Sequence, residues 1–240
     1  MNLGKAFTYP FEDKAWTTKV GLGIVITLVP ILNFATAGYL IEIMRRLLRG
    51  DPEPLPDWTD LGRKFMDGLM VFLAGLVYFL PVLIVLSVPA GLMLIPAVLA
   101  GNTNTQNIGQ ILSTAGGVAL ACLGCLAILY GVALSIIFPC AYLQYARQGR
   151  FGTFFQLQEF FALIGKDAGA FFTAWGIYLA TSIGATLVAG AVGGLFGLIP
   201  CVGQLVAFVI GLGVGLYVAL VFAHLFGQFG LAVSRQAPTA

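Results

Sequence analysis

The side chains that could do chemistry are few, and they lie within long apolar stretches. His224 is the single histidine of the chain, and Gln228 follows four residues later, so a helix would place both on one face. Such a pair could bind a polar headgroup or pass a proton, because an ionisable residue at membrane depth is a functional candidate by default. The alternative, which we favour, is a neutral histidine hydrogen-bonded to another helix near the cytoplasmic interface.

Asn33 and Gln204 complete the candidate polar intramembrane site, since they are the other polar amides near predicted membrane depth. Cys122 and Cys125 form a CxxC motif, but within a helix they read as two small packing residues on one face. A metal would need more ligands than one histidine supplies. The chain has no Ser/His/Asp set, paired intramembrane carboxylates, phosphate loop or HExxH motif. We therefore predict no catalytic residue, cofactor or metal site, and a protein that is not an enzyme.

The composition predicts an integral membrane protein. Of the 240 residues, 59% are hydrophobic and 9% are charged, and the mean hydropathy is +0.96. A soluble domain carries roughly a quarter charged residues, so this chain has too little polar surface to face water. A net charge of +2 without a basic stripe excludes a nucleic-acid partner. The expected partners are membrane lipid and either a second copy of the chain or a larger membrane complex.

The positions of the charged residues divide the chain. Sixteen lie between Lys5 and Asp67, five between Arg147 and Asp167, and the last is Arg235. Each uncharged stretch between them is long enough for two spans of about 20 residues. The fold class is therefore an all-α polytopic helical bundle with four full spans. We place the spans near residues 69–88, with 89–100 as a continuation, and near 108–142, 170–196 and 205–229; polar turns at 101–107 and 198–204 join the paired spans.

Basic residues in short loops favour the cytoplasmic side. This rule puts the Pro-rich loop and the C-terminus in the cytoplasm and the protein in the cytoplasmic (plasma) membrane. No cleavable signal is evident in the first 19 residues. The chain reads as one membrane domain with seven segments: 1–19 interfacial, 20–49 re-entrant or spanning, 50–67 Pro-rich loop, 68–146 first helical hairpin, 147–167 cytoplasmic loop, 168–234 second helical hairpin, and 235–240 tail.

The apolar segment from Val20 to Ile41 allows two topologies. As one helix its 22 residues would measure about 33 Å and would cross the membrane once. A re-entrant hairpin bent at Pro30 to Asn33 would instead keep the early lysines on the cytoplasmic side. We favour the re-entrant form, and both alternatives stay open at this stage.

Small residues recur at every fourth position of the last two predicted spans. This spacing is typical of helices whose backbones approach closely, within one chain or between chains. The predicted helix-packing residues are Ala185, Ala189, Gly193, Gly211, Gly215 and Ala219.

Several motifs resemble one family. They are Phe7-Thr-Tyr-Pro-Phe-Glu-Asp13, Val29-Pro-Ile-Leu-Asn-Phe34, Gly38-Tyr-Leu40, Arg49-Gly-Asp51, Pro54-Leu-Pro-Asp-Trp58, Asp67-Gly-Leu69 and Ala223-His-Leu-Phe-Gly-Gln228. The chain resembles the DUF4013-type family of polytopic membrane proteins, whose function is unknown. The resemblance implies a membrane topology and supplies no reaction. We expect a non-catalytic accessory or scaffolding subunit packing through Gly/Ala-rich helices; the alternative is a small transporter or lipid-handling protein with a site near His224 and Gln228.

Overall fold

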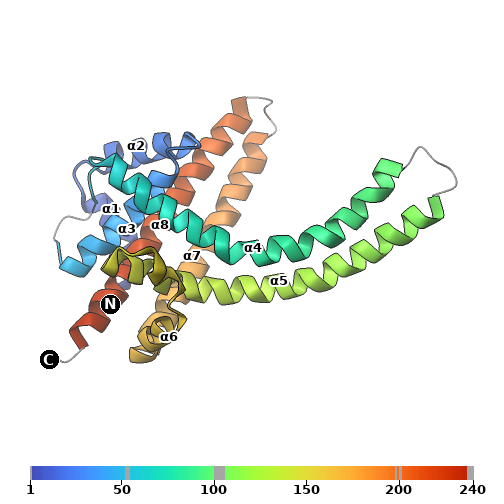
Figure 1. The fold of residues 1–240 in the computed structure, drawn as a ribbon. Helices are drawn as coiled ribbons and strands as arrows, with labels where there is room; N and C mark the ends of the chain where they lie inside the picture. The colour runs from blue at the N-terminus through green and yellow to red at the C-terminus, as the bar shows by residue number, and fades with distance from the viewer. Residues whose placement is uncertain (1, 52–54, 100–105, 198, 200–201, 237–240) are drawn as a thin grey trace. The chain divides into compact units, whose positions relative to one another are not determined.

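A computed structural model describes residues 2–51, 55–99, 106–197, 199 and 202–236, and the described chain is all α-helical (Figure 1). Four of its helices are long and apolar enough to cross a membrane. They are α4 (Leu61–Leu99), α5 (Gln106–Gln148), α7 (Ala168–Gly197) and α8 (Val202–Gln236). The four predicted spans fall within these helices, so the prediction of four membrane-length helices is confirmed. The predicted turns at 101–107 and 198–204 lie partly outside the described residues.

The N-terminal segment forms three short helices, which are α1 (Leu3–Glu12), α2 (Trp16–Leu28) and α3 (Phe34–Arg49). Residues 20–41 are therefore not one helix, because the chain turns between α2 and α3 at the place where Pro30 predicts a bend. Backbone hydrogen bonds close this turn: the Asn33 N–H donates to the Val29 carbonyl at 2.9 Å. The Thr27 and Thr36 hydroxyls, 2.9 Å apart, join α2 to α3 across it.

Much of the two predicted loops is ordered helix. Residues 61–67 of the expected Pro-rich loop form the first turns of α4, while Leu55 and Trp58 are buried. The Trp58 ring stacks on Tyr39 with a centroid distance of 4.3 Å. The predicted loop 147–167 contains a 3₁₀ helix, η2 (Phe151–Phe155), and the helix α6 (Leu157–Lys166). Aromatic packing explains the order in both segments.

The helices divide into two compact units, and the division falls inside α4 and α5. Unit 2 comprises residues 73–137 and is a hairpin of the second part of α4 and most of α5. Its helices approach closely where Gly116 faces the Pro89 carbonyl, which would lie 2.8 Å from a Cβ atom at Gly116. The Tyr130 hydroxyl also donates to the Tyr78 carbonyl at 2.9 Å. Most large apolar side chains of this hairpin are exposed, as expected for helices that face lipid.

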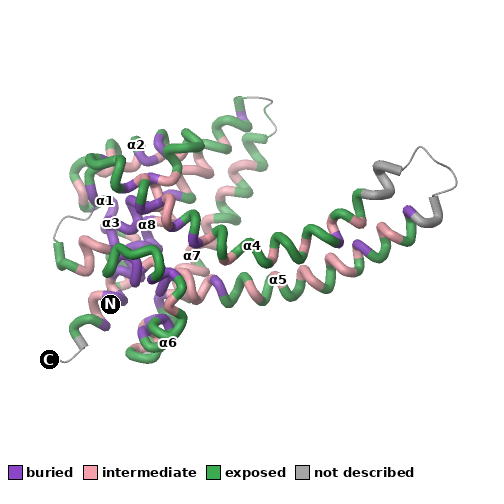
Figure 2. The backbone as a smooth tube through the Cα atoms, viewed as in Figure 1, coloured by how far each residue is buried: buried purple, intermediate pink, exposed green. Residues whose placement is uncertain are grey.

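Unit 1 comprises residues 1–72 and 138–240, and the C-terminal half of α8 is its central helix. Every residue from Leu220 to Gly227 is buried, because α1, α3 and α7 pack around this part of α8 (Figure 2). The last turns of α5 join them: Gly230 of α8 faces the Leu143 side chain. A helix that is covered on all sides must be apolar all round, which accounts for the continuous apolar run of α8.

The closest helix crossing in unit 1 joins α3 to the first turns of α4. A Cβ atom at Gly38 would overlap the Lys64 carbonyl, and one at Gly68 would overlap the Phe34 carbonyl. The two backbones therefore touch, and only glycine fits at either position. This crossing brings the charged ends of α3 and α4 together.

Candidate functional site

The predicted pair His224 and Gln228 is joined by a hydrogen bond and holds α1 against α8. Gln228 Nε2 lies 3.0 Å from His224 Nδ1. The same side chain bonds to Asn2 twice: its Oε1 accepts from the Asn2 backbone N–H at 2.8 Å, and its Nε2 donates to the Asn2 carbonyl at 3.1 Å. The amide of Gln228 thus uses both of its N–H groups within the protein.

These bonds also determine the tautomer of His224. Because the Asn2 N–H requires an acceptor, the amide oxygen of Gln228 faces Asn2, and the amide nitrogen faces the imidazole ring. An amide N–H can only donate, so His224 Nδ1 accepts and the ring proton lies on Nε2. The Tyr9 ring stacks on the imidazole with centroids 4.1 Å apart. A neutral histidine is therefore part of the contact between α1 and α8.

Two tyrosine hydroxyls extend this contact along α8. Tyr9 donates to the Leu220 carbonyl at 3.0 Å, and Tyr217 donates to the Phe7 carbonyl at 3.1 Å. Together with the Asn2 bonds, they show that α1 runs antiparallel to α8. The side chain of His224 lies in the interior of this contact, with 4% of its surface exposed.

Asn33 and Gln204 are not brought to His224. Asn33 is exposed in the turn before α3, where its side chain makes no capping bond. Gln204 is exposed in the first turn of α8, roughly 30 Å along the helix from His224. The four candidate residues therefore do not form one polar site.

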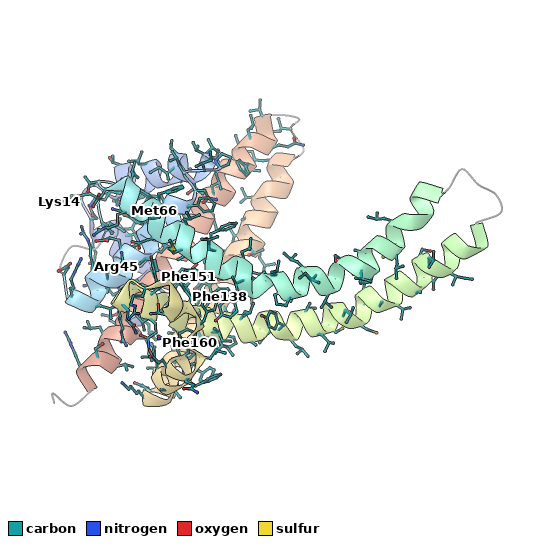
Figure 3. The ribbon with its side chains drawn as sticks, viewed as in Figure 1. Lys14, Arg45, Met66, Phe138, Phe151 and Phe160 are labelled. Atoms are coloured by element: carbon teal, nitrogen blue, oxygen red, sulfur yellow. The ribbon has the colours of Figure 1, made fainter. Side chains whose placement is uncertain are left out.

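A second polar group, which the sequence analysis missed, joins α3, α4 and α5; we call it the Asp67 cluster, and it consists of Arg45, Asp67 and Tyr145. The Arg45 guanidinium binds Asp67 through two nitrogens, with Nη2 lying 3.0 Å from Oδ1. The Tyr145 hydroxyl donates to the same Oδ1 at 2.8 Å. Burial of the guanidinium by itself would lower the pKa of Arg45. The hydrogen bonds and the negative charge of Asp67 outweigh this effect, so the pKa of Arg45 is raised. Figure 3 labels Arg45 near the end of α3.

A ring of further charges surrounds Glu42, one turn before Arg45 on α3. Arg63 donates to Glu42 Oε2 at 2.7 Å, and Arg46 and Arg49 lie within 4 Å of Oε1. The buried Lys64 ammonium donates to the Thr59 carbonyl at 2.7 Å. Of these contacts, the one between Arg63 and Glu42 links the end of α3 to the start of α4. The carboxylates of Glu42 and Asp67 thus both accept hydrogen bonds from side chains of neighbouring helices.

The sequence contained a partial signal for this group. Gly38 and Asp67 both occur in the quoted motifs, and the structure gives a reason for each: the first allows the helix crossing and the second makes its central ion pair. Tyr145 carried no signal, because a tyrosine at the end of an apolar span is typical of any membrane interface.

Only some of the predicted helix-packing residues lie where two helices contact each other. Gly193 approaches Ala207 of α8, with 3.9 Å between a Cβ at Gly193 and the Ala207 Cβ, so α7 and α8 lie side by side there. A Cβ at Gly211 or Gly215 would meet no atom within 4 Å. Ala185, Ala189 and Ala219 are partly exposed. The contact face of α8 toward α3 instead contains Gly227, which faces the Leu47 side chain.

The cysteines carry no paired chemistry in the described chain. Cys122 and Cys125 are free and exposed on α5, whereas Cys140 is free and buried. Cys201 lies outside the described residues. Within the described ranges, no three His, Cys, Asp or Glu side chains are placed to hold a metal ion.

Comparison with known proteins gives a family and nothing more specific. No curated protein and no solved structure matches the chain. The family model described as "Protein of unknown function (DUF4013)" matches residues 21–196. This range runs from within α2 to the last turn of α7 and includes the crossing of α3 and α4 and the Asp67 cluster, whereas His224 and Gln228 lie beyond it. The chain therefore belongs to the DUF4013 family.

Proposed function

We propose that this membrane protein is a non-catalytic accessory or scaffolding subunit. The observation that supports this role is the use of its polar side chains: the buried Glu42 and Asp67 and the partly buried Gln228 all bind groups on neighbouring helices. Catalysis and transport require polar groups that can exchange partners with a substrate. These groups instead hold α1, α3, α4, α5 and α8 together, which makes unit 1 a rigid support.

The exposed part of α8 offers a surface for a second membrane helix. Gly211 and Gly215 lie one turn apart with open space above both, and Phe208 and Val209 beside them are exposed. Without a hydrophobic driving force in lipid, helices associate where small residues allow close packing. The proposed partner is a second copy of the chain or a helix of a larger membrane complex.

Crosslinking in native membranes tests this role. Cysteine placed at Val214 should give a crosslinked species larger than the monomer, and Gly211→Leu with Gly215→Leu should reduce its yield severalfold by separating the helices. Gly184→Leu on α7 is the matched control, since a Cβ there also meets open space. A protein that stays monomeric and free of partners in mild detergent and in membranes would refute the role.

The competing transport role would need a site at His224 and Gln228. What favours the accessory role is that Asn2 and His224 already occupy the Gln228 amide, while the Tyr9 ring covers the imidazole. A substrate would first have to displace α1.

We also propose that α2 and α3 form a re-entrant hairpin in the cytoplasmic membrane, with the Pro-rich loop and C-terminus in the cytoplasm. The tip of this hairpin exposes apolar side chains, which are Leu22, Val25, Leu28, Val29, Ile31 and Leu32. The closed backbone bonds of the turn lower the cost of placing it in lipid. At the base, Lys19 binds Asp13 at 2.8 Å and Asp57 at 2.9 Å.

The charged side chains at the base of the hairpin support placing this base at the membrane–water interface. Burial alone would lower the pKa of Lys19, but the hydrogen bonds and charges of Asp13 and Asp57 outweigh burial and raise it. An ion group of this kind belongs near water, while the tip belongs in hydrocarbon.

Cysteine labelling in a cysteine-free background tests this topology. Cysteines at Lys14 and Arg235, both exposed, should react with an impermeant maleimide from the same side of sealed vesicles, and one at Ile31 should react from neither side. Labelling of Lys14→Cys and Arg235→Cys from opposite sides would show a single crossing and contradict the hairpin.

A further inference from the structure

The segment η2–α6, between the long helices α5 and α7, has two distinct apolar faces. One face is covered: Phe154 stacks on Tyr145 with centroids 4.6 Å apart, and Phe160 and Leu163 are buried. The other face is open, with Leu157 and Phe161 43% and 64% exposed. These two residues are four apart and therefore adjacent on α6.

The covered face fixes the segment to unit 1. Glu159 accepts a hydrogen bond from Gln144 at 3.0 Å, and the Asp167 carboxylate accepts from the Ala170 N–H at 2.9 Å at the start of α7. The open face of α6 is thus held in one orientation relative to the ends of α5 and α7. Figure 3 labels Phe151 and Phe160 on this segment, after the end of α5.

Exposed aromatic rings also occur in the segments that precede and follow α6 along the chain. Phe151 and Phe155 of η2 lie 5.5 Å apart and are 38% and 37% exposed. Phe172, in the first turns of α7, is also exposed and contacts Trp175 with a centroid distance of 6.3 Å. Aromatic side chains at the ends of membrane helices are typical of the headgroup region.

Two basic residues stand at the ends of the segment. Arg150 precedes η2 and Lys166 ends α6, and both are exposed. Among the described residues, neither side chain makes an ion pair, whereas Glu159 and Asp167 each accept a hydrogen bond from a neutral N–H group. The segment therefore has an exposed basic side chain at each end and exposed apolar side chains between them.

We propose that η2–α6 lies in the membrane interface and binds anionic lipid headgroups through Arg150 and Lys166, while Leu157 and Phe161 enter the acyl boundary. An anionic leaflet complements the side chains of Arg150 and Lys166, and the acyl boundary suits the exposed side chains of Leu157 and Phe161. Each basic residue near such a surface contributes about a fivefold change in lipid affinity. This inference rests on membrane insertion and is independent of the accessory role.

Spin labelling of the full chain in lipid vesicles tests the inference. In a cysteine-free background, a nitroxide at Phe161→Cys should be more accessible to oxygen than to a water-soluble nickel complex. A label at Gln158→Cys, also exposed but on the polar side of α6, should show the opposite preference. A label at Phe161→Cys that is accessible mainly to nickel would place α6 in water, and one shielded from both reagents would show a protein partner; either result overturns the inference.

The lipid dependence tests the charges separately. The Phe161→Cys label should lie deeper in vesicles of mixed phosphatidylglycerol and phosphatidylcholine than in phosphatidylcholine alone. Arg150→Gln with Lys166→Gln should abolish this difference, and Lys14→Gln, an exposed lysine on another segment, should leave it unchanged. Equal depth in both lipids for the parent protein would refute recognition of anionic headgroups. Loss of crosslinking with this lipid dependence intact would refute only the accessory role.

Discussion

Asp67→Asn is expected to lower the free energy of unfolding by about 3–5 kcal/mol, because it leaves a partly buried guanidinium without its counter-charge. The side chains of Arg45 and Asp67 are 17% and 11% exposed, so water cannot replace the lost carboxylate fully. Asparagine has nearly the same volume and retains an oxygen for the Tyr145 hydroxyl. The decrease in the free energy of unfolding would therefore come from the lost ion pair and not from a cavity.

Thermal unfolding of the purified protein in a mild detergent measures this effect, which corresponds to a Tm decrease of roughly 10 °C. Asp60→Asn is the matched control, because Asp60 is 68% exposed and lies 3.9 Å from Arg63. An exposed ion pair of this kind contributes little to stability, so the control should unfold at the same temperature as the parent protein. Equal Tm values for the two variants would show that the Asp67 cluster is not a main support of unit 1.

Gly38→Ala is expected to be among the most damaging single-methyl additions in the described chain. Its Cβ would overlap the Lys64 carbonyl, and backbone cannot rotate away as a side chain can. The helices α3 and α4 would have to separate, at a cost of about 3 kcal/mol or more. Separation would also lengthen the contacts of the Asp67 cluster.

Gly62→Ala provides the control for this variant, since a Cβ there meets no atom within 4 Å in the first turn of α4. Helix propensity predicts a gain of up to about 1 kcal/mol for this control. The two variants should therefore shift the unfolding transition in opposite directions, and Gly38→Ala should also reduce the amount of folded protein in membranes. A Gly38→Ala protein as stable as the parent would show that α3 and α4 do not cross through this contact.

The membrane-length helices were predictable because their signal is local. A helix needs only an uninterrupted apolar run, and the charged residues mark where each run stops. The contact between His224 and Gln228 could be predicted for the same reason, because residues four apart share a helix face. Periodicity thus identified which residues lie beside each other on one helix.

Contacts between helices could not be derived in this way. Tyr145 and Asp67 are 78 positions apart, and Gln228 and Asn2 are 226 apart, so no spacing rule connects them. Glu42 and Arg45 are three residues apart on one helix, which suggests a local pair, whereas their main partners lie on α4. The sequence analysis predicted packing at the glycines of α8, although the closest backbone crossing is at Gly38 and Gly68. A single glycine in each helix is enough for a crossing and leaves no repeating pattern.

The antiparallel contact of α1 with α8 has a consequence for the order in which the protein is made. Tyr9 and its acceptor Leu220 are 211 residues apart. At ribosomal rates of 5–20 residues per second, α1 leaves the ribosome about 10–40 s before the helix that receives it. The helix α1 is thus synthesised well before α8, and during that interval the imidazole-stacking face of Tyr9 has no native partner. The contact between α1 and α8 therefore forms only after the segment between them has been translated.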